Sequence, residues 1–355
     1  MTKVQRLGIL TGGGDCPGLN PAIKSVVTKA CMSGVKEVIG IRDGWRGLME
    51  TGPSSVMALD ANVVRHIDRQ GGTILGTSRT NPFKNHDGAD YLKKCWQELK
   101  LDALVAIGGE DTLGVAARLF KDHQLAIVGI PKTIDRDLAG TEYTLGFESA
   151  LQVITDSVDS LRSTAESHSR IFVVEIMGRH AGHLALRGGI SAGANIILIP
   201  EHPFSVERVC QLLKDRKKRE IRYSIVFVSE GAKLENGQEI LQGNEVDAFG
   251  HARLGGISEW LAARIQEQTG IECRSLNLSH LQRGGRPVAF DRRIGFYFGI
   301  AATEAVLAGK FGVMAALKEG RVCLVSLQEA VGALRLVDVK QAYDAEFYRA
   351  SRSII

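Results

Sequence analysis

The sequence has few of the features that mark secreted, membrane-spanning or metal-binding chains. Its 355 residues include only eight prolines and six cysteines, and no two cysteines form a C-x-x-C pair. A thiolate metal site or a redox pair is therefore unsupported, and reduced cytosolic thiols are expected. The N-terminus shows no signal-peptide pattern, and no apolar run is long enough to span a bilayer. We expect a cytoplasmic protein that has no membrane partner.

An excess of one charge is also lacking. The chain has 44 Lys and Arg residues against 40 Asp and Glu residues, for a net charge of +4. It has no long basic run, and the cluster at residues 280–287 lacks the interleaved aromatic residues that stack on nucleic-acid bases. The mild positive balance suits an anionic small molecule, and we expect no nucleic-acid partner.

Glycine is abundant, at 40 residues, and it punctuates a regular alternation of apolar runs and helical patterns. Short β-branched runs that are typical of buried parallel strands lie at residues 6–10, 38–41, 104–107, 126–130 and 171–176. Two more, each with a carboxylate at its end, lie at residues 196–201 and 224–231. The alternation predicts an α/β fold with a parallel sheet and right-handed crossovers, repeated in two halves. Residues 233–250 are polar and glycine-spotted, which predicts an exposed loop.

Two glycine-rich segments are candidates for binding phosphate. Residues 11–20 follow the first predicted strand and lead into a helix, for which we expect Asn20 as N-cap and Pro21 as the first residue. Backbone N–H groups can approach an anion there, although the spacing fits neither the dinucleotide fingerprint nor the Walker motif, and a purely structural turn is the alternative. In residues 71–79, Arg79 either reaches a phosphate or is an ordinary surface arginine.

Charged residues follow a buried strand at residues 130–137. Lys132, Asp135 and Asp137 should lie at the carboxyl end of that strand, where ligands bind in open α/β sheets. A general base, a cation and a metal-seeking carboxylate together suit phosphoryl transfer. The alternative is an Asp N-cap with two solvated turn charges.

Acidic and histidine pairs elsewhere permit more than one interpretation. Glu110 and Asp111 either complement a helix dipole or hold Mg²⁺, which commonly takes one or two carboxylates and substrate phosphates. His180 and His183 have no third ligand nearby, so ordinary polar roles are expected. The histidine and arginine of residues 280–286, beside paired glycines, fit a sugar phosphate.

Together these segments resemble the phosphofructokinase family of the bacterial type. The resemblance extends from about Arg6 to beyond Arg293, and its most specific elements are residues 13–15 (GGD), 108–110 (GGE), 133–135 (TID), 177–179 (MGR) and 280–285 (HLQRGG). It implies two Rossmann-like three-layer domains with mainly parallel sheets. Residues 1–146 and 282–333 would form the phosphoryl-donor domain, and residues 147–281 and 334–355 the fructose 6-phosphate domain.

The resemblance also implies roles for individual residues. Asp135 would be the general base, Thr133 would lie beside the reacting groups, and Arg179 and the Gly13 N–H would offset charge on the phosphoryl group in flight. The implied fructose 6-phosphate residues are Thr133, Asp135, Arg170, Met177, Gly178, Arg179, Glu230, Arg274, His280 and Arg283. Glu110 and Asp137 match Mg²⁺-site carboxylates. Arg170 and Arg274 match positions that reach a neighbouring subunit's site, which implies a homodimer or homotetramer.

The donor is indicated by Asp111 and Lys132. ATP-dependent relatives usually carry glycine at the first position and often at the second, and the Asp and Lys pair resembles the pyrophosphate-dependent branch. The implied donor residues are Gly13, Gly14, Arg79, Gly109, Asp111, Thr112 and Lys132. We therefore predict reversible, Mg²⁺-dependent transfer of phosphate from pyrophosphate to fructose 6-phosphate.

Alternatives remain open at this level. The chain would otherwise be an ATP-dependent 6-phosphofructokinase, or a non-catalytic sugar-phosphate-binding subunit, which the intact Asp135 and Arg179 disfavour. Sedoheptulose 7-phosphate is a possible second acceptor. Arg136 stands where the family usually has Asn, so that it would bind phosphate, lower the basicity of Asp135 or point away. Lys24, Thr28 and Asn195 replace residues of effector-regulated members, so the usual allosteric control is not expected.

Overall fold

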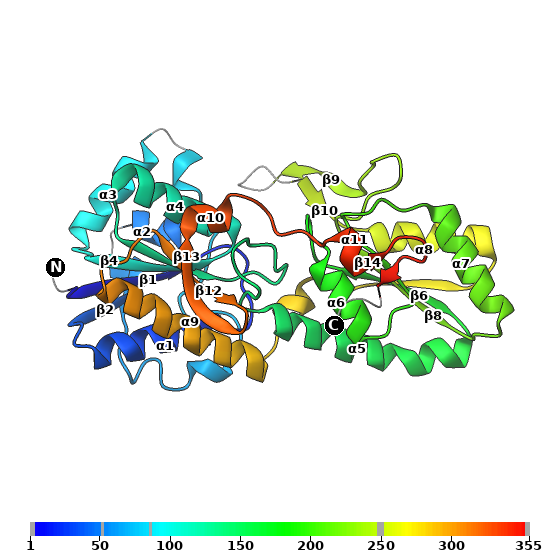
Figure 1. The fold of residues 1–355 in the computed structure, drawn as a ribbon, viewed down its shortest axis with the longest axis horizontal. Helices are drawn as coiled ribbons and strands as arrows, with labels where there is room; N and C mark the ends of the chain where they lie inside the picture. The colour runs from blue at the N-terminus through cyan, green and yellow to red at the C-terminus, as the bar shows by residue number, and fades with distance from the viewer. Residues whose placement is uncertain (1–3, 51–52, 85–86, 247–251, 352–355) are drawn as a thin grey trace. The chain divides into compact units, whose positions relative to one another are not determined.

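The computed structural model describes residues 4–50, 53–84, 87–246 and 252–351, and the chain divides into two compact units (Figure 1). Unit 1 comprises Met1–Ile134, Leu138–Ser149 and Arg283–Leu334. Unit 2 comprises Asp135–Asp137, Ala150–Gln282 and Arg335–Ile355. The predicted division assigns residues 135–137 to the donor domain, whereas these three residues group with unit 2.

Unit 1 is built on one seven-stranded sheet whose strand order is β13-β12-β5-β4-β1-β2-β3. Its strands are β1 (Arg6–Thr11), β2 (Glu37–Ile41), β3 (Val56–Ala58), β4 (Ala103–Gly108), β5 (Ile127–Pro131), β12 (Val313–Lys318) and β13 (Arg321–Ser326). Its helices are α1 (Leu19–Met32), α2 (Trp45–Met49), α3 (Gly88–Glu98), α4 (Glu110–His123), α9 (Ala289–Leu307) and α10 (Leu327–Val331), with 3₁₀ turns at Pro53–Ser55, Ile67–Arg69 and Pro82–Lys84. The central strands pair in parallel, while β3 and β13 pair antiparallel at the two edges.

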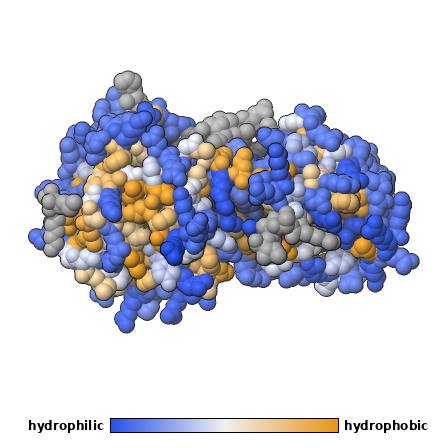
Figure 2. Space-filling model, in the orientation of Figure 1, coloured by the Kyte–Doolittle hydropathy of each residue, from blue (hydrophilic) through white to orange (hydrophobic). Residues whose placement is uncertain are grey.

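Helices cover both faces of this sheet. Helices α1 and α9 pack against each other on one side, and α4 packs on β4 and β5 with α10 on the other (Figure 1). The central strands β4 and β5 are apolar throughout, and every one of their residues is buried. Hydrophobic residues show among hydrophilic ones on the face of unit 1 drawn in Figure 2. The continuous burial explains why these strands read as uninterrupted apolar runs in the sequence.

The start of α1 differs from the predicted one. The helix begins at Leu19, and its N-cap is Gly18, so the prediction of Asn20 as N-cap is wrong. The Asn20 amide instead donates to the carbonyls of Gln70 and Gly71 and accepts from the Ile74 N–H at 2.9 Å. An Asn side chain offers both donors and an acceptor, and here they fasten the second glycine-rich segment to the first.

Unit 2 contains a four-stranded parallel sheet with the order β11-β6-β8-β7. Its strands are β6 (Ile171–Ile176), β7 (Ile196–Leu198), β8 (Ser224–Ser229) and β11 (Cys273–Asn277), with antiparallel pairs β9 (Leu241–Val246) with β10 (Ala252–Leu254) and β14 (Tyr343–Asp344) with β15 (Arg349–Ala350). Its helices are α5 (Phe147–His168, whose first three residues belong to unit 1), α6 (His183–Ser191), α7 (Val206–Lys218), α8 (Ile257–Thr269) and α11 (Val339–Ala342), with a 3₁₀ turn at Ser279–Arg283.

Unit 2 differs from the prediction at residues 233–250. We predicted an exposed loop there, but Leu241–Val246 forms strand β9, and residues 247–250 lie outside the described part of the chain. Strand β9 forms by pairing with β10. Its polar sequence has no alternation of apolar and polar residues, so no periodic pattern predicted a strand.

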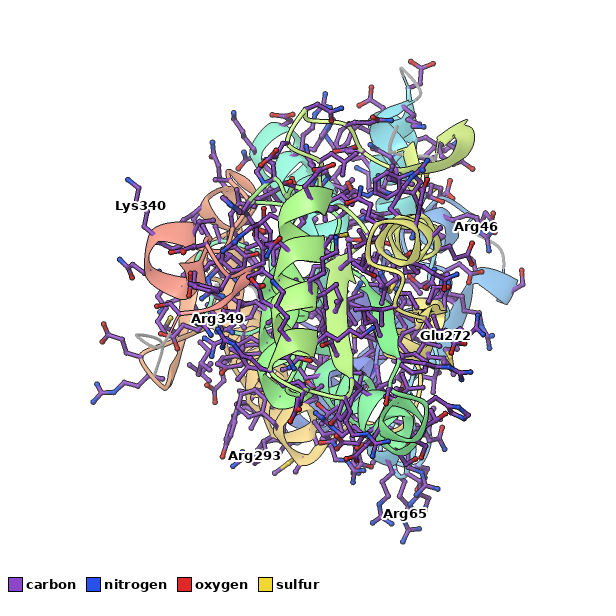
Figure 3. All side chains as sticks on the ribbon, turned by 90° about the vertical axis from the view of Figure 1, so that its right-hand side faces the viewer. Arg46, Arg65, Glu272, Arg293, Lys340 and Arg349 are labelled. Atoms are coloured by element: carbon purple, nitrogen blue, oxygen red, sulfur yellow. The ribbon has the colours of Figure 1, made fainter. Side chains whose placement is uncertain are left out.

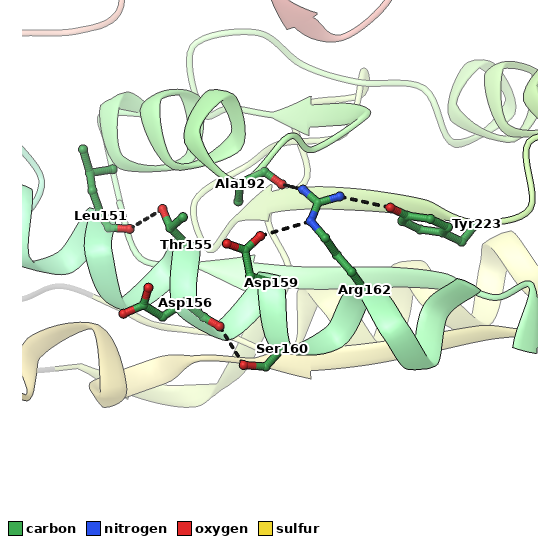
Figure 4. A network of polar contacts seen from close by, with 8 residues as sticks. All are labelled: Leu151, Thr155, Asp156, Asp159, Ser160, Arg162, Ala192 and Tyr223. Atoms are coloured by element: carbon green, nitrogen blue, oxygen red, sulfur yellow. Dashed lines mark hydrogen bonds and ion pairs between the residues drawn. The ribbon is translucent and has the colours of Figure 1, made fainter. Parts of the chain in front are cut away.

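Side-chain hydrogen bonds fasten α5 to the rest of unit 2. Arg162 lies 3.1 Å from Asp159 one turn earlier, donates to the Tyr223 hydroxyl at 3.1 Å and donates to the Ala192 carbonyl (Figure 4). The guanidinium thereby joins α5 to the end of α6 and the start of β8, using the several N–H donors that only arginine offers in one plane.

Two predictions about composition have a structural outcome. The six cysteines are free thiols, as predicted. Within the described residues, none of the helices has the length and apolar character that crossing a bilayer requires.

Candidate active site

Three strands of unit 1 end together and so bring three candidate loops to one edge of the sheet. Thr11 pairs with Ile107, and Gly108 pairs with Pro131, so β1, β4 and β5 finish at matching levels. The next residues in the chain are the first glycine-rich loop, Gly109 and Lys132. Carboxyl ends of parallel strands are where open α/β sheets bind ligands, so the sheet gathers the predicted donor residues at the expected place.

The glycine-rich loop after β1 packs closely on the first turn of α4. A Cβ atom at Gly12 would lie 2.5 Å from Thr112 Oγ1, so only glycine permits this approach. The Gly13 N–H donates to the Ser78 carbonyl at 3.1 Å, and the Thr77 hydroxyl donates to the Gly13 carbonyl at 2.6 Å. The Gly13 N–H predicted to face a phosphoryl group therefore has a protein partner in this structure, and Thr112 is buried beneath the loop.

Two cationic side chains of unit 1 contact carbonyls of this loop. Lys132 is 3% exposed, and its Nζ donates to the Gly14 carbonyl at 2.5 Å. Arg283 donates from one terminal nitrogen to the Asp15 carbonyl at 3.2 Å. Arg283, which we predicted to bind fructose 6-phosphate, thus contacts the glycine loop, and its role toward the sugar phosphate stays a prediction. A buried ammonium and a guanidinium on one glycine loop form a local positive field suited to an anion of high charge.

The acidic pair of unit 1 occupies the start of α4. Glu110 and Asp111 lie in the first turn of the helix and are exposed, with Gly109 as the residue before it. This position stabilises the helix through its dipole and also leaves both carboxylates accessible to a ligand. Arg79 is likewise exposed. Across the described ranges, no three histidine, cysteine, aspartate or glutamate side chains gather as a metal-binding group.

The acidic turn after β5 is not a helix cap. Helix α5 begins only at Phe147, and Asp135 and Asp137 are partly buried, so the alternative of an N-cap with solvated turn charges does not hold. Arg136 between them is 6% exposed and has a left-handed φ of 57°. Such a backbone costs a residue with a Cβ roughly 1–2 kcal/mol, so its surroundings must hold it.

Glu230 of unit 2 lies at the end of β8 and shares its environment with Asp135. Burial and the neighbouring negative charge of Asp135 raise the pKa of Glu230 to about 7, although the Gly178 N–H and Arg179 act in the opposite direction. The Gly178 N–H donates to Glu230 Oε1 at 3.3 Å. A carboxyl group that exchanges a proton near neutral pH is a common property of functional sites.

The loop of residues 177–179 is held by residues that sequence reasoning did not select. Gln282 is fully buried, and its Oε1 accepts from the Met177 N–H at 3.1 Å. The Ser229 hydroxyl donates to the Gly178 carbonyl at 2.6 Å. A Cβ atom at Gly231 would lie 1.9 Å from the Arg179 carbonyl oxygen, so glycine is required there. Gln282 lies within the HLQRGG motif, and that motif was the one feature of the sequence that pointed to a role for Gln282.

Two predicted phosphate-binding arginines of unit 2 share one carboxylate. Glu272, labelled in Figure 3, precedes β11 and lies 2.8 Å from Arg170 Nε and 2.6 Å from a terminal nitrogen of Arg274. The hydrogen bond from Arg170, with the charges of both arginines, lowers the pKa of Glu272. His280 is exposed, 3.1 Å from the Ser279 hydroxyl. The arginine pair therefore has an anionic partner within its own chain.

Known proteins resemble the chain over nearly its whole length. A model of the phosphofructokinase family matches residues 6–306. The chain is 49% identical over 343 residues to a protein of Amycolatopsis methanolica named pyrophosphate--fructose 6-phosphate 1-phosphotransferase, which covers 97% of this chain and 99% of the relative. It is 45% identical over 341 residues to ATP-dependent 6-phosphofructokinase 3 of Streptomyces coelicolor, covering 96% and 99%. The crystal structure of Pichia pastoris phosphofructokinase in the T-state matches with a TM-score of 0.82 at 33% identity, covering 94% of this chain and 38% of that longer chain.

Proposed function

The chain belongs to the phosphofructokinase family, and on that premise we propose that it transfers a phosphoryl group from pyrophosphate to fructose 6-phosphate. The reaction forms a bond between phosphorus and the sugar's O1, breaks the bridging P–O bond of pyrophosphate and releases phosphate. The reaction is reversible, because the bond broken and the bond formed are of similar energy.

The observation that carries the donor assignment is Asp111 in the first turn of α4. The side chain is exposed at the edge of the sheet where β1, β4 and β5 end. Two like charges at about 4 Å repel by roughly 4 kcal/mol at an intermediate effective dielectric, and half of that is already more than tenfold in affinity. A nucleotide's α-phosphate beside Asp111 would meet this repulsion, whereas pyrophosphate carries no further phosphate there.

The cations of unit 1 support the same donor. Lys132 and Arg283 each donate to a carbonyl of the loop at Gly14 and Asp15, which holds their charged ends beside the glycine backbone. In the proposed reaction both positive charges attract pyrophosphate. Gly13, Gly14, Arg79, Gly109 and Thr112 complete the proposed donor set.

Unit 2 supplies the proposed chemistry at the acceptor. Asp135 accepts the proton of the 1-hydroxyl as its oxygen attacks, and Arg179 offsets charge on the phosphoryl group. Glu230, near its pKa at neutral pH, binds a sugar hydroxyl, with Met177, Gly178 and His280 around the sugar. Catalysis of this kind depends mainly on positioning and electrostatics.

We propose that Mg²⁺ takes part, bound through Glu110 and Asp137 with water and pyrophosphate oxygens as the other ligands. Hard carboxylate oxygens are the ligands that Mg²⁺ prefers, and one or two suffice when a polyphosphate supplies the rest. When bound, the ion neutralises charge on the transferred group and the leaving phosphate. We also propose a cytoplasmic enzyme that works as a homodimer or homotetramer, in which Arg170 and Arg274 reach the sugar phosphate of a neighbouring copy.

A donor comparison on the unmodified protein tests the proposal. Initial rates with fructose 6-phosphate are measured with pyrophosphate, ATP and other nucleotides at matched free Mg²⁺. We expect kcat/KM for pyrophosphate to exceed that for ATP by far more than tenfold. Values within a few-fold of each other would refute the donor assignment.

An ATP-dependent 6-phosphofructokinase is the second candidate, because a relative with 45% identity carries that name. The same experiment decides between the two, since this candidate requires efficient turnover with MgATP. Binding of fructose 6-phosphate without turnover under any donor would instead indicate a sugar-phosphate-binding subunit.

A further inference from the structure

A short segment near the C-terminus touches two loops of unit 2 that carry proposed site residues. Residues 335–337 return to unit 2 after the last part of unit 1. The Arg335 N–H donates to the Asp137 carbonyl at 2.7 Å, and the Arg335 carbonyl lies 3.0 Å from His183 Nε2. The Val337 N–H donates to Glu201 Oε1 at 2.9 Å. The segment therefore connects the turn of Asp135 and Asp137 with the start of α6.

The chemistry of the His183 contact fixes which ring nitrogen carries the proton. A carbonyl oxygen only accepts, so His183 Nε2 must be the protonated nitrogen that donates to Arg335. Burial, with the positive charges of Arg335, Arg136 and Arg187, lowers the pKa of His183 to about 4, so the ring is neutral at pH 7. The neutral imidazole is therefore held as the Nε2–H tautomer, at the first residue of α6 and four residues after Arg179.

Glu201 fastens the other end of the segment to the same helix. Its carboxylate accepts from the Gly182 N–H at 2.9 and 3.1 Å, and Gly182 is the N-cap residue of α6. The carboxylate thus satisfies an N–H at the helix start while it holds Val337. His183 and Glu201 together bind residues 335–337 to the loop that begins at Met177.

The turn that this segment contacts requires external support. Arg136 has a left-handed backbone and is buried, and a turn of this kind persists only where its neighbours determine it. The hydrogen bond from Arg335 to the Asp137 carbonyl is one such constraint, and it acts one residue after Arg136. The positive charge of Arg136 is also one of the causes that lower the pKa of His183.

We propose that His183 is a positioning residue for the reaction, which acts through Arg335 on the turn of Asp135 and Asp137, with Glu201 as its partner at Val337. The expected effect on turnover rests on the proposed function. The His183 side chain donates a hydrogen bond to the Arg335 carbonyl, and the N–H of the same residue donates to the Asp137 carbonyl. The turn of the general base is thereby connected through Arg335 to the start of α6, by one side-chain and one main-chain hydrogen bond.

Two substitutions of His183 and one control separate positioning from simple stability. His183→Leu removes the donor, and His183→Gln restores an N–H at similar reach. Tyr343→Phe is the control, because it removes the 2.6 Å hydrogen bond from Tyr343 to the Ile197 carbonyl and so loosens the C-terminal region elsewhere. For each variant, kcat, both KM values, Tm and amide hydrogen exchange at Arg335 and Val337 are measured.

We expect His183→Leu to lower kcat about 10- to 100-fold, as small displacements of reacting groups do, with KM for fructose 6-phosphate within about threefold. His183→Gln should recover kcat to within a few-fold of the original. Exchange at Arg335 should quicken at least about tenfold in His183→Leu and much less in Tyr343→Phe. The control should lose Tm but keep kcat.

Three results would overturn the proposal. Unchanged exchange at Arg335 in His183→Leu would show that His183 does not hold the segment. A loss of kcat in Tyr343→Phe as large as in His183→Leu, or a His183→Gln variant that does not recover kcat, would show that His183 only stabilises the fold. The exchange measurement needs no substrate, so it stands even where pyrophosphate fails as donor in the unmodified protein.

Discussion

The proposed site residues of the two units differ in the charges that they carry and in what holds those charges in place. In unit 1 the charged ends of Lys132 and Arg283 are hydrogen-bonded to main-chain carbonyls of one glycine loop. In unit 2 the key groups are carboxylates close enough that Asp135 helps to raise the pKa of Glu230 to about 7. These two cations of unit 1 carry permanent charges held beside the backbone, while Glu230 of unit 2 carries a charge that depends on pH near neutrality.

This difference separates two tasks of the proposed reaction. Fixed cations bind a polyanion without a proton change, so substitutions in unit 1 should alter donor affinity. Glu230 takes up and releases a proton near neutral pH, so substitutions at this end of unit 2 should alter turnover and pH dependence. Kinetic and stability measurements on substituted proteins test whether the two tasks are separate.

The largest effect is expected for the base in unit 2. Asp135→Asn should lower kcat about 10³-fold, as removal of a general base typically does, while fructose 6-phosphate still binds within a few-fold. Steady-state kinetics with pyrophosphate and a direct binding assay measure the two quantities. Asp215→Asn, on the solvent-facing side of helix α7, is the control and should keep full activity. More than a tenth of the original kcat in Asp135→Asn would exclude Asp135 as the base.

A smaller effect, on KM for pyrophosphate rather than on kcat, is expected for the buried Lys132 in unit 1. Lys132→Met removes a charge-assisted contact worth roughly 1.5–3 kcal/mol, so KM for pyrophosphate should rise about 10- to 100-fold. KM for fructose 6-phosphate should change less than about threefold, because Lys132 belongs to the donor unit. Titration of each substrate against a saturating partner gives both values.

Lys29→Met is the matched control for that substitution, since Lys29 pairs with Glu304 at the surface of the same unit. It should leave both KM values unchanged. An equal rise in both KM values for Lys132→Met would show that the assignment of affinity to unit 1 is wrong.

The smallest effect concerns the pH dependence of stability. The pKa of Glu230 is raised from 4.5 to about 7, so the folded state holds its proton more tightly and stability is lost as pH rises through this range. The shift corresponds to at most roughly 3 kcal/mol. Glu230→Gln should therefore gain several degrees of Tm relative to the original protein at pH 8.5, and less at pH 5.

Thermal unfolding of both proteins without substrate at the two pH values measures this difference. Glu207→Gln in α7 is the control, because hydrogen bonds lower the pKa of Glu207 and any pH trend should be small and opposite. A Tm difference for Glu230→Gln that does not grow with pH would show that the ionised Glu230 carboxylate does not destabilise the folded protein.

Much of the fold follows from the sequence because buried parallel strands carry an unmistakable pattern. The predicted run at residues 171–176 coincides with β6, and the predicted run at residues 224–231 contains β8, which ends at Ser229; every residue of both strands is buried. Strand β9 was missed because polar residues in a two-stranded pair lack that pattern. The helix start at Leu19 was misplaced because Asn20 bonds to residues 70–74, and no local rule anticipates a partner fifty residues away.

The candidate site divides in the same way. Residues at strand ends, such as Lys132 and Asp135, were found because position in the sheet and residue type agree. Gln282, Ser229 and Gly231 act through long-range contacts with the loop of residues 177–179, which depend on how unit 2 folds. The family resemblance supplied the motifs, but only the three-dimensional structure shows that Arg283 donates to the Asp15 carbonyl.

The most direct test of the central claim is the donor preference of a variant that carries both Asp111→Gly and Lys132→Gly. The measured quantity is the ratio of kcat/KM for pyrophosphate to that for ATP, at matched Mg²⁺ and saturating fructose 6-phosphate. Removing the repulsion at residue 111 should lower this ratio at least about tenfold, with measurable turnover of ATP. A ratio equal to that of the original protein, with the variant folded and active, would contradict the account.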